Sequence, residues 1–166
     1  MNIFYLDHNP KRCAQMHVDK HCVKMILEYA QLLSTAHRVL DGVESVRLSK
    51  TGRKQKWFAL SGERESALYS ATHVNHPSAK WVRQSVHNYI WLAELLEELC
   101  VEYTYRYGKI HKVESSGLMQ MLKNNIPHNL PEGNFTEPTP AMPDAYKVDN
   151  DSIQSYWNYY NNDKRR

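Results

Sequence analysis

The sequence has no long hydrophobic run, few cysteines and no common nucleotide-binding signature. No apolar stretch approaches the roughly 18 to 20 residues that a membrane-spanning helix needs, which excludes a transmembrane protein. The apolar residues near the N-terminus have no basic residue ahead of them, unlike those of a secretory signal. Three widely spaced cysteines do not suit a disulfide framework and favour reduced thiols in a cytoplasm. P-loop, dinucleotide-binding and nucleophile-elbow motifs are missing too, and no cofactor is expected.

Composition and charge narrow the class of protein further. The chain has 166 residues, of which 42% are hydrophobic, so general disorder is excluded and a single domain over residues 1–166 is expected. Its 21 Lys and Arg against 18 Asp and Glu give a net charge of +3, which permits a nucleic-acid partner without demanding one. Nine histidines and eleven tyrosines are the unusual feature, and their positions carry the functional argument.

Glycine and proline are missing from two long stretches, and this predicts a mainly α fold built on two long packed helices. The first helix is expected over about 11–40 and ends before Gly42; the second is expected over about 77–107 and ends before Gly108. Five of the seven prolines lie between Pro127 and Pro143, which predicts an irregular surface segment over about 123–150. The smaller expected elements are a strand at 3–6, a loop or hairpin at 41–62, short helices at 63–70 and 117–122, and a last helix that starts at Asp151 or Ser152.

Polar residues form a stripe along the first predicted helix. At about 100° per residue, Glu28 shares a face about 100° wide with seven others, namely His17, Lys20, His21, Lys24, Gln31, Thr35 and Arg38. Such a stripe can be the solvated face of an amphipathic helix. Because the apolar arc covers most of the wheel, however, we expect it to line a substrate-binding cleft in which Glu28 acts as general acid or base, with His21 beside it.

A second polar cluster precedes the second predicted helix. His73, Asn75 and His76 lie just before Pro77, where unpaired N–H groups at a helix N-terminus favour an anion. Ser85 and Asn88 lie on the inward stripe of the same helix and would face Glu28 if the two helices pack together. We therefore expect all five residues to bind substrate; the alternative is a capped helix start with two ordinary histidines.

Cations and aromatic residues predict a nucleic-acid surface. Residues 47–56 contain five cations and no acid, and aromatic residues follow them directly. Such a segment can track a phosphate backbone, although it can equally be a solvated loop. The C-terminal aromatic cluster is open to the same two interpretations, core packing or base stacking. The residues expected to contact nucleic acid are Lys50, Arg53, Lys54, Lys56, Trp157 and Tyr160.

A metal site is a further alternative. Cys13, His17 and His21 recur at intervals of four, which places them on one helix face, and a histidine from the 73–76 cluster could complete a tetrahedron. The segment lacks the glutamate of a zinc-protease HExxH motif, and Lys20 and Lys24 would place positive charge near the ion. The sequence therefore favours a site without metal.

Residues 19–28 resemble the first-helix motif of the phage-type pyrimidine-dimer DNA glycosylase/AP lyases, the endonuclease V type. In that family an Asp-x-His is followed, seven residues beyond the histidine, by the catalytic glutamate, and His21 and Glu28 match these two positions. Residues 72–74 are similar to the Gly-His-Val of the family, and residues 156–160 are similar to its aromatic C-terminus. The chain also resembles uncharacterised phage-borne proteins.

The resemblance implies a mostly helical enzyme that cleaves an N-glycosidic bond in DNA. In the family the N-terminal α-amine attacks C1′ of the sugar and forms a Schiff base, while the glutamate handles protons. An α-amine can do this because part of it is neutral at physiological pH. Here the amine belongs to Met1, or to Asn2 if Met1 is removed.

The chain departs from the family at three positions. The bulkier Asn2 replaces a small threonine, which leaves both retention and removal of Met1 open, and Leu27 and Gln31 replace arginines that flank the family's glutamate. These differences keep an alternative open: a phage counter-defence protein that binds or cleaves a nucleotide or nucleotide signal at the same cleft, without DNA repair activity.

Overall fold

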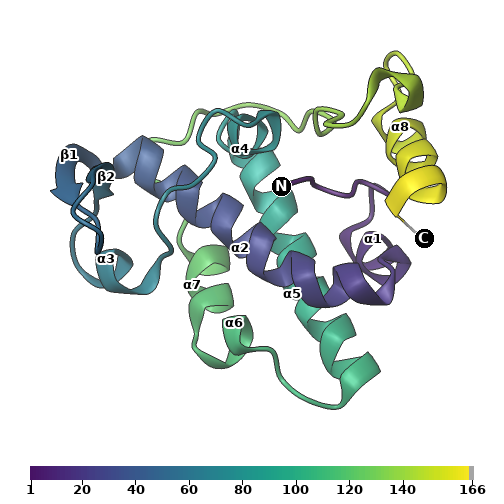
Figure 1. Cartoon of the computed structure of the whole chain (residues 1–166). Helices are drawn as coiled ribbons and strands as arrows, with labels where there is room; N and C mark the ends of the chain where they lie inside the picture. The colour runs from purple at the N-terminus through teal and green to yellow at the C-terminus, as the bar shows by residue number, and fades with distance from the viewer. Residues whose placement is uncertain (165–166) are drawn as a thin grey trace.

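Two long helices pack together in the middle of the molecule (Figure 1). A computed structural model describes residues 1–164 of the chain, and within them helices predominate and the only sheet has two strands. The central pair is α2 (Asp19–Asp41) and α5 (Val86–Tyr107), whose buried leucines, isoleucine and aromatic rings form the core. The predicted mainly α fold is confirmed.

Shorter elements surround this pair. The hairpin that continues α2 consists of β1 (Val43–Leu48) and β2 (Lys54–Ala59), paired antiparallel with Val43 opposite Ala59 and Leu48 opposite Lys54. The remaining helices are α1 (Pro10–Met16), α3 (Glu63–Ala67), α4 (Pro77–Val82), α6 (Lys112–Ser115), α7 (Leu118–Asn124) and α8 (Ser152–Tyr159). A 3₁₀ turn over Asp144–Tyr146 precedes α8, and a π-helical turn over Tyr160–Lys164 follows it.

The first predicted helix is interrupted, and the prediction of one helix over 11–40 was wrong. α1 ends at Met16 and α2 begins at Asp19, with His17 and Val18 extended between them. Two side chains, one in the break itself and one near the far end of the chain, take the place of backbone partners that a continuous helix would supply. The His17 ring bonds the Cys13 carbonyl, and the Val18 N–H donates to the Tyr160 hydroxyl at 2.6 Å. Because these partners satisfy the free helix ends, the break is stable without glycine or proline.

The second predicted helix is interrupted in the same way. α4 ends at Val82, and Ser85 caps α5 by accepting a hydrogen bond from the Asn88 N–H. The next free donor, the Val86 N–H, bonds the carbonyl of Pro131 in the proline-rich segment. The expected inward stripe survives the break, since Trp81, Ser85 and Asn88 are all buried.

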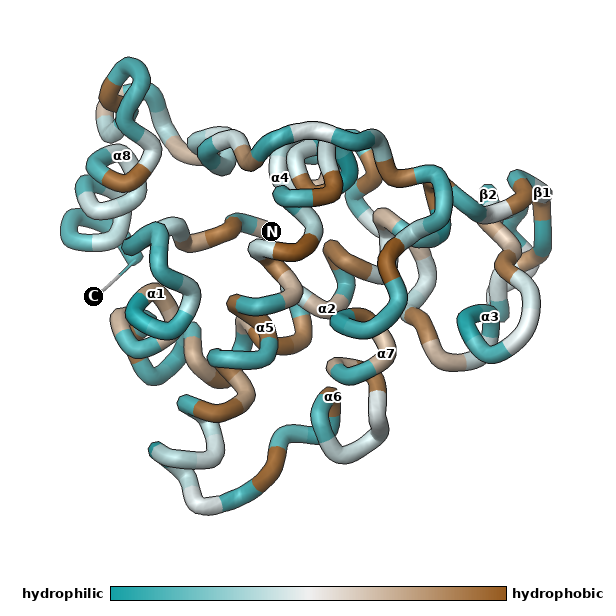
Figure 2. The backbone as a smooth tube through the Cα atoms, turned by 180° about the vertical axis from the view of Figure 1, so that it is seen from behind, coloured by the Kyte–Doolittle hydropathy of each residue, from teal (hydrophilic) through white to brown (hydrophobic). Residues whose placement is uncertain are grey.

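The N-terminal residues form a buried extended segment and not the predicted strand. Residues 3–6 are all buried in the core, and the Phe4 N–H donates to the Tyr29 hydroxyl of α2 instead of to a neighbouring strand. Hydrophobic positions recur along this segment and along α5 in the middle of the molecule (Figure 2). Burial, and not strand pairing, holds the N-terminus here.

Local signals predicted most of the other elements. Residues 41–62 form the hairpin, α3 is shorter than the expected 63–70, and α7 is slightly later than the expected 117–122. Asp151 caps α8 by accepting from the Gln154 N–H, and Gly108 ends α5 with a left-handed φ of 67°. The proline-rich segment is irregular as expected, from Asn125 to the 3₁₀ turn. Within residues 1–164 no helix is both long and apolar enough to cross a bilayer.

Candidate functional site

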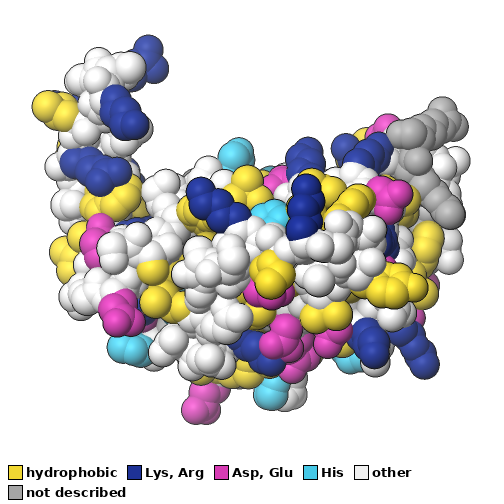
Figure 3. Space-filling model, turned by 90° about the horizontal axis from the view of Figure 1, so that it is seen from below, with side chains coloured by type: hydrophobic (Ala, Val, Ile, Leu, Met, Phe, Trp, Pro, Cys, Tyr) yellow, Lys and Arg dark blue, Asp and Glu magenta, His cyan; other side chains and the backbone are white. Residues whose placement is uncertain are grey.

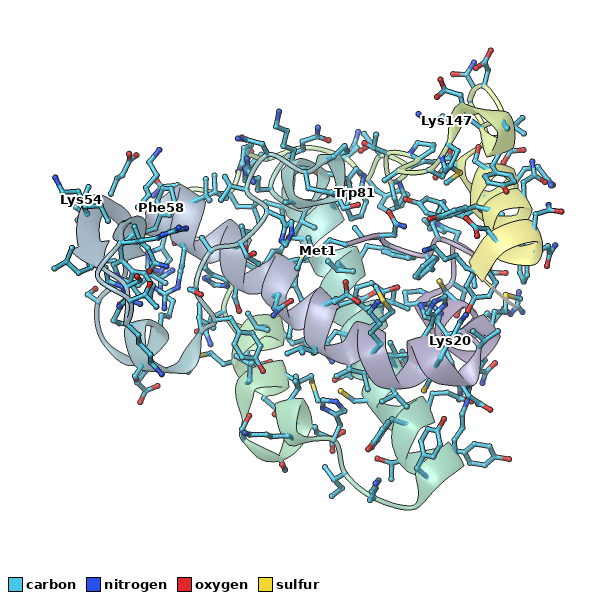
Figure 4. The ribbon with its side chains drawn as sticks, in the orientation of Figure 1. Met1, Lys20, Lys54, Phe58, Trp81 and Lys147 are labelled. Atoms are coloured by element: carbon cyan, nitrogen blue, oxygen red, sulfur yellow. The ribbon has the colours of Figure 1, made fainter. Side chains whose placement is uncertain are left out.

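The N-terminal amine lies next to Glu28, whose side chain projects from the middle of α2. The Met1 nitrogen is 3.8 Å from Oε1 of Glu28, and their side chains are only 6% and 17% exposed. On the other carboxylate oxygen, Lys24 approaches to 3.9 Å with a side chain that is 71% exposed. Figure 4 shows Met1 over the middle of α2, between Lys20 at one end of the helix and the hairpin at the other. One carboxylate thus lies between two amines, one shielded and one open to solvent.

A hydrogen-bond chain from α2 holds the N-terminal segment in place. The Phe4 N–H donates to the Tyr29 oxygen at 3.2 Å, and the Tyr29 hydroxyl donates to Nε2 of His17 at 2.7 Å. Since Nδ1 of His17 must donate to the Cys13 carbonyl, Nε2 is left as the acceptor. Tyr29 directly follows Glu28 in the sequence, so the same helical turn carries the carboxylate and the anchor of the amine. Tyr29 lies outside the polar stripe of α2, and no neighbouring residue in the sequence indicates these distant partners.

His21 helps to hold the N-terminal segment in place and does not lie in an open cleft beside Glu28. Its ring stacks on Phe4 with centroids 4.4 Å apart, and its Nδ1 bonds the Tyr160 hydroxyl at 3.0 Å. Burial and the nearby lysines lower the pKa of His21 to about 4, and burial lowers the pKa of His17 to about 4 as well. Both rings are therefore neutral at physiological pH, and both contact the segment that carries Met1.

The loop that precedes α4 lies close to the amine. Thr35 fixes it to α2 by accepting from the Thr72 N–H and bonding the Thr72 carbonyl. His73 is exposed with a positive φ of 50°. His76 caps α4, and its pKa is lowered by burial, by the positive N-terminus and by His73. Because charge on the N-terminus influences His76, the two groups share one electrostatic environment. Asn75 is exposed in the same loop, but no contact joins it to Glu28.

The carboxylate is incompletely satisfied. Oε2 of Glu28 is buried and has no hydrogen-bond partner, although Lys24 contributes charge nearby. A buried acceptor without a partner costs free energy, and substrate-binding sites are a common place for such groups. The arrangement places a shielded α-amine next to a carboxylate, with an exposed cation that can contact an anion beside them.

Three residues predicted to bind substrate have structural roles. Arg38 is 1% exposed and donates all five N–H groups inside the protein, to the carboxylate of Glu65 and to backbone carbonyls. Asn88 bonds the Trp81 carbonyl and both the N–H and the hydroxyl of Thr136. Ser85 donates to the Asn134 carbonyl. Arg38 thus anchors the hairpin and α3, while the other two hold the proline-rich segment.

The polar stripe consequently divides into parts with different surroundings. His17 lies in the break before α2, so its position on the helical wheel does not apply, and His21, Thr35 and Arg38 are buried. Lys20 is exposed near the start of α2, and Gln31 is half-buried about one turn beyond Glu28. Asn2 is half-buried next to the amine. The structure brings together Met1, Glu28 and Lys24, with the 72–76 loop beside them.

The predicted nucleic-acid residues lie at opposite ends of the molecule. The four cations are all exposed on the hairpin. Trp157 is half-buried and donates to the Leu6 carbonyl, and Tyr160 is buried against Phe4. The two C-terminal rings pack on the N-terminal segment, so their geometry matches core packing and not base stacking.

Cysteine and histidine geometry gives no support to the metal alternative. In the described part of the chain no group of three or more His, Cys, Asp or Glu side chains is placed to hold an ion. The Cys13 thiol donates to the Phe4 carbonyl, and both ring nitrogens of His17 are engaged in hydrogen bonds. The spacing of four is therefore used for packing between α1, α2 and the N-terminal segment.

Comparison of the chain with protein-family models, with curated proteins and with solved structures finds no match. The chemistry of the site therefore has to be inferred from the groups that meet at Glu28.

Proposed function

We propose that this protein is a DNA glycosylase-like enzyme that cleaves the N-glycosidic bond of a damaged or modified base in DNA. The Met1 α-amine acts as the nucleophile, and Glu28 handles the protons. The observation that carries the proposal is the 3.8 Å approach of the shielded amine to the carboxylate. An amine that must lose a proton before it attacks needs a base within reach, and Glu28 is the carboxylate in that position.

In the proposed reaction the Met1 ammonium first loses a proton to Glu28, and the freed lone pair forms a bond to C1′ of the deoxyribose while the bond from C1′ to the base breaks. The bonding electrons leave with the base, and Glu28 returns its proton to the base. Glu28 then takes a second proton from the attached nitrogen and passes it to the ring oxygen, O4′, so that the sugar ring opens and gives an iminium, the Schiff base. Water hydrolyses the iminium to release the sugar and restore the amine. Lys24 contacts a flanking phosphate, since its side chain is exposed beside the carboxylate.

Borohydride trapping tests the covalent step, because reduction turns the iminium into a stable amine link between protein and DNA. The substrates are duplexes that contain an abasic site, a uracil or a pyrimidine dimer. We expect an adduct with at least one of them, and peptide mapping should place it on the N-terminal residue. The intact mass of the protein shows at the same time whether Met1 is retained.

Two variants and a blocked protein separate the roles. Glu28→Gln keeps the shape of the side chain but removes the base, and we expect cleavage to fall by about two to four orders of magnitude. Glu94→Gln is the matched control, because Glu94 is exposed on α5. Acetylation of the N-terminus should abolish the adduct. An adduct that persists after acetylation and maps to Lys24 would show that the wrong amine has been assigned.

The nucleotide-binding alternative is favoured by one observation. Where the resembled family carries arginines beside its glutamate, this chain has an exposed Leu27 and a half-buried Gln31, so the cations that would hold a DNA backbone are missing there. In this case no DNA adduct forms with any of the three duplexes. Lys24→Ala and His73→Ala should then each remove binding of a nucleotide, while Glu28→Gln leaves it intact.

A further inference from the structure

The hairpin carries more positive charge than the whole chain. Residues 43–59 contain five cations and a single acid, Glu44, which gives +4 against +3 for all 166 residues. The rest of the chain is therefore slightly acidic. In Figure 3 the hairpin stands out from the body at one end of the molecule, and Lys and Arg side chains lie among uncharged ones on its outer part. A projecting, strongly positive ribbon on an otherwise nearly neutral protein is suited to a polyanion.

The two faces of the hairpin differ. Cross-strand neighbours share a face and successive residues alternate, so Arg47, Gln55 and Trp57 lie on one side. The other side presents Lys54 and Lys56 together with Val46 and Leu48, whose exposed fractions are 68% and 66%. A partner that covers this face would bury both aliphatic side chains and would meet the lysines beside them.

The aromatic residue of the first face is already engaged. The Arg47 guanidinium lies 3.2 Å from the centroid of the Trp57 ring, and Arg38 lies 4.8 Å from it. The Trp57 N–H also donates to Glu65. Because the Arg47 guanidinium already lies over this ring, we do not expect Trp57 to stack on an unpaired base in the way that retains single strands. The hairpin instead has cations for phosphates and a width that the major groove of a duplex admits.

The base of the hairpin is held firmly against the body. Gly42 is the only residue between α2 and β1, and a Cβ on it would lie 2.3 Å from the Arg38 carbonyl. Arg38 itself donates to the carbonyls of Phe58 and Leu68. The hairpin therefore has a fixed direction relative to Glu28, which precedes Gly42 by about four helical turns, or roughly 20 Å. That distance is within one turn of duplex DNA, about 34 Å.

We propose that the hairpin is a duplex-binding arm: Lys50, Arg53 and Lys54 contact the phosphate backbone of double-stranded DNA, while Val46 and Leu48 rest against the groove. The contact fixes the register of the duplex along α2. This inference goes beyond the proposed function, because it concerns binding of intact duplex and requires no cleavage at Glu28.

The test measures affinity of the full chain for an undamaged, fluorescein-labelled duplex of about two turns, by anisotropy over a range of salt concentrations. The hairpin variant combines K50Q, R53Q and K54Q and leaves the ion pair between Lys56 and Glu44 in place. The matched control combines K11Q, K109Q and K112Q, which removes the same charge from exposed positions elsewhere. Circular dichroism checks that both variants fold.

We expect the hairpin variant to bind about tenfold more weakly or worse, with the slope of log K against log salt reduced by about three. The control should stay within about twofold of the parent. Equal losses in the hairpin and control variants, or none in either, would overturn the proposal. So would single-stranded DNA that binds as tightly as the duplex. Tighter, hairpin-dependent binding to phosphatidylglycerol vesicles would assign the arm to a lipid surface instead.

Discussion

At the scale of the residue, two neighbours on α2 divide the work of the site. Glu28 faces the N-terminal amine, and Tyr29, one step further around the helix, is fully buried and bonded to Phe4 and His17. The carboxylate is the group that reacts in the proposed mechanism. The phenol acts through the segment it holds, since the amine lies three residues before Phe4.

Tyr29→Phe tests this division of roles. The ring remains, but the buried Phe4 N–H and Nε2 of His17 each lose a partner, which should cost about 1–3 kcal/mol of stability. Because the N-terminal segment loosens, we expect the single-turnover rate of borohydride trapping to fall about tenfold or more while the affinity for the same DNA stays unchanged.

Tyr105→Phe serves as the control for Tyr29→Phe, because Tyr105 is exposed on α5. A merely structural role for Tyr29 would lower stability alone. An unchanged trapping rate in Tyr29→Phe would therefore contradict the positioning role.

At the scale of the element, Arg38 connects three parts of the fold. Arg38 is buried in the last turn of α2, and its guanidinium pairs with the Glu65 carboxylate of α3 at 2.8 Å. Its other N–H groups donate to backbone carbonyls that include one in β2 and one just after α3. Glu65 also accepts from the Leu60 N–H, and these partners together hold its pKa below its usual value. One side chain thus replaces the helix packing that a two-stranded hairpin lacks.

Arg38→Met keeps much of the length of the side chain but removes all five donors. The loss leaves several backbone carbonyls without partners and removes the cation that pairs with the Glu65 carboxylate, so we expect the free energy of unfolding in urea to fall by about 3–5 kcal/mol. Arg47→Met, whose cation lies on the exposed hairpin, should cost less than about 1 kcal/mol. Equal effects of the two substitutions would show that the hairpin base is not anchored by Arg38.

The ends of helices were predictable where nearby residues determine them, and not where a residue distant in the sequence does. Asp151, Gly42 and Gly108 mark helix ends through their own backbone or side chain, so the sequence showed them. The break at 17–18 depends on Tyr160, more than a hundred residues away, and cannot be read from nearby residues. The site followed the same rule: Glu28 and Lys24 are neighbours on one helix, whereas the burial of Arg38 depends on tertiary contacts.

At the scale of the whole molecule, three buried, neutral histidines join parts of the chain that are far apart in the sequence. His17 and His21 hold the N-terminal segment against α2 and the C-terminal turn. His37 lies between α2, α3 and α5, where its Nε2 donates to the Tyr89 oxygen and its Nδ1 accepts from Arg64. A proton on Nδ1 of His37 would face the guanidinium, and a proton on Nε2 of His17 would displace the Tyr29 hydroxyl.

These histidines should make the fold sensitive to mild acid. Burial is the main cause that lowers the pKa of each to about 4, below the ordinary 6.5 that the unfolded chain shows. As the pH falls, these histidines take up protons in the unfolded chain before they do so in the folded protein. The folded state therefore has its full stability with respect to these groups above about pH 6.5 and loses it as the pH falls toward 4. Between pH 7 and pH 5 each histidine should cost roughly 2 kcal/mol of unfolding free energy. Protonation of Asp41 and Glu65 affects stability only at a lower pH than this, because the pKa values of both carboxyls lie below their ordinary values.

Urea unfolding at half-unit steps from pH 7 to pH 5 measures this loss of unfolding free energy. Single substitutions then show how much of it each histidine contributes. His17→Gln and His37→Gln should each flatten the pH dependence by close to one proton, whatever they cost in stability at pH 7. If His17→Gln and His37→Gln gave the slope of the parent chain, protonation of these rings would not be what limits stability in acid. A second group, buried and uncharged in the folded state, would then have to titrate in the same range.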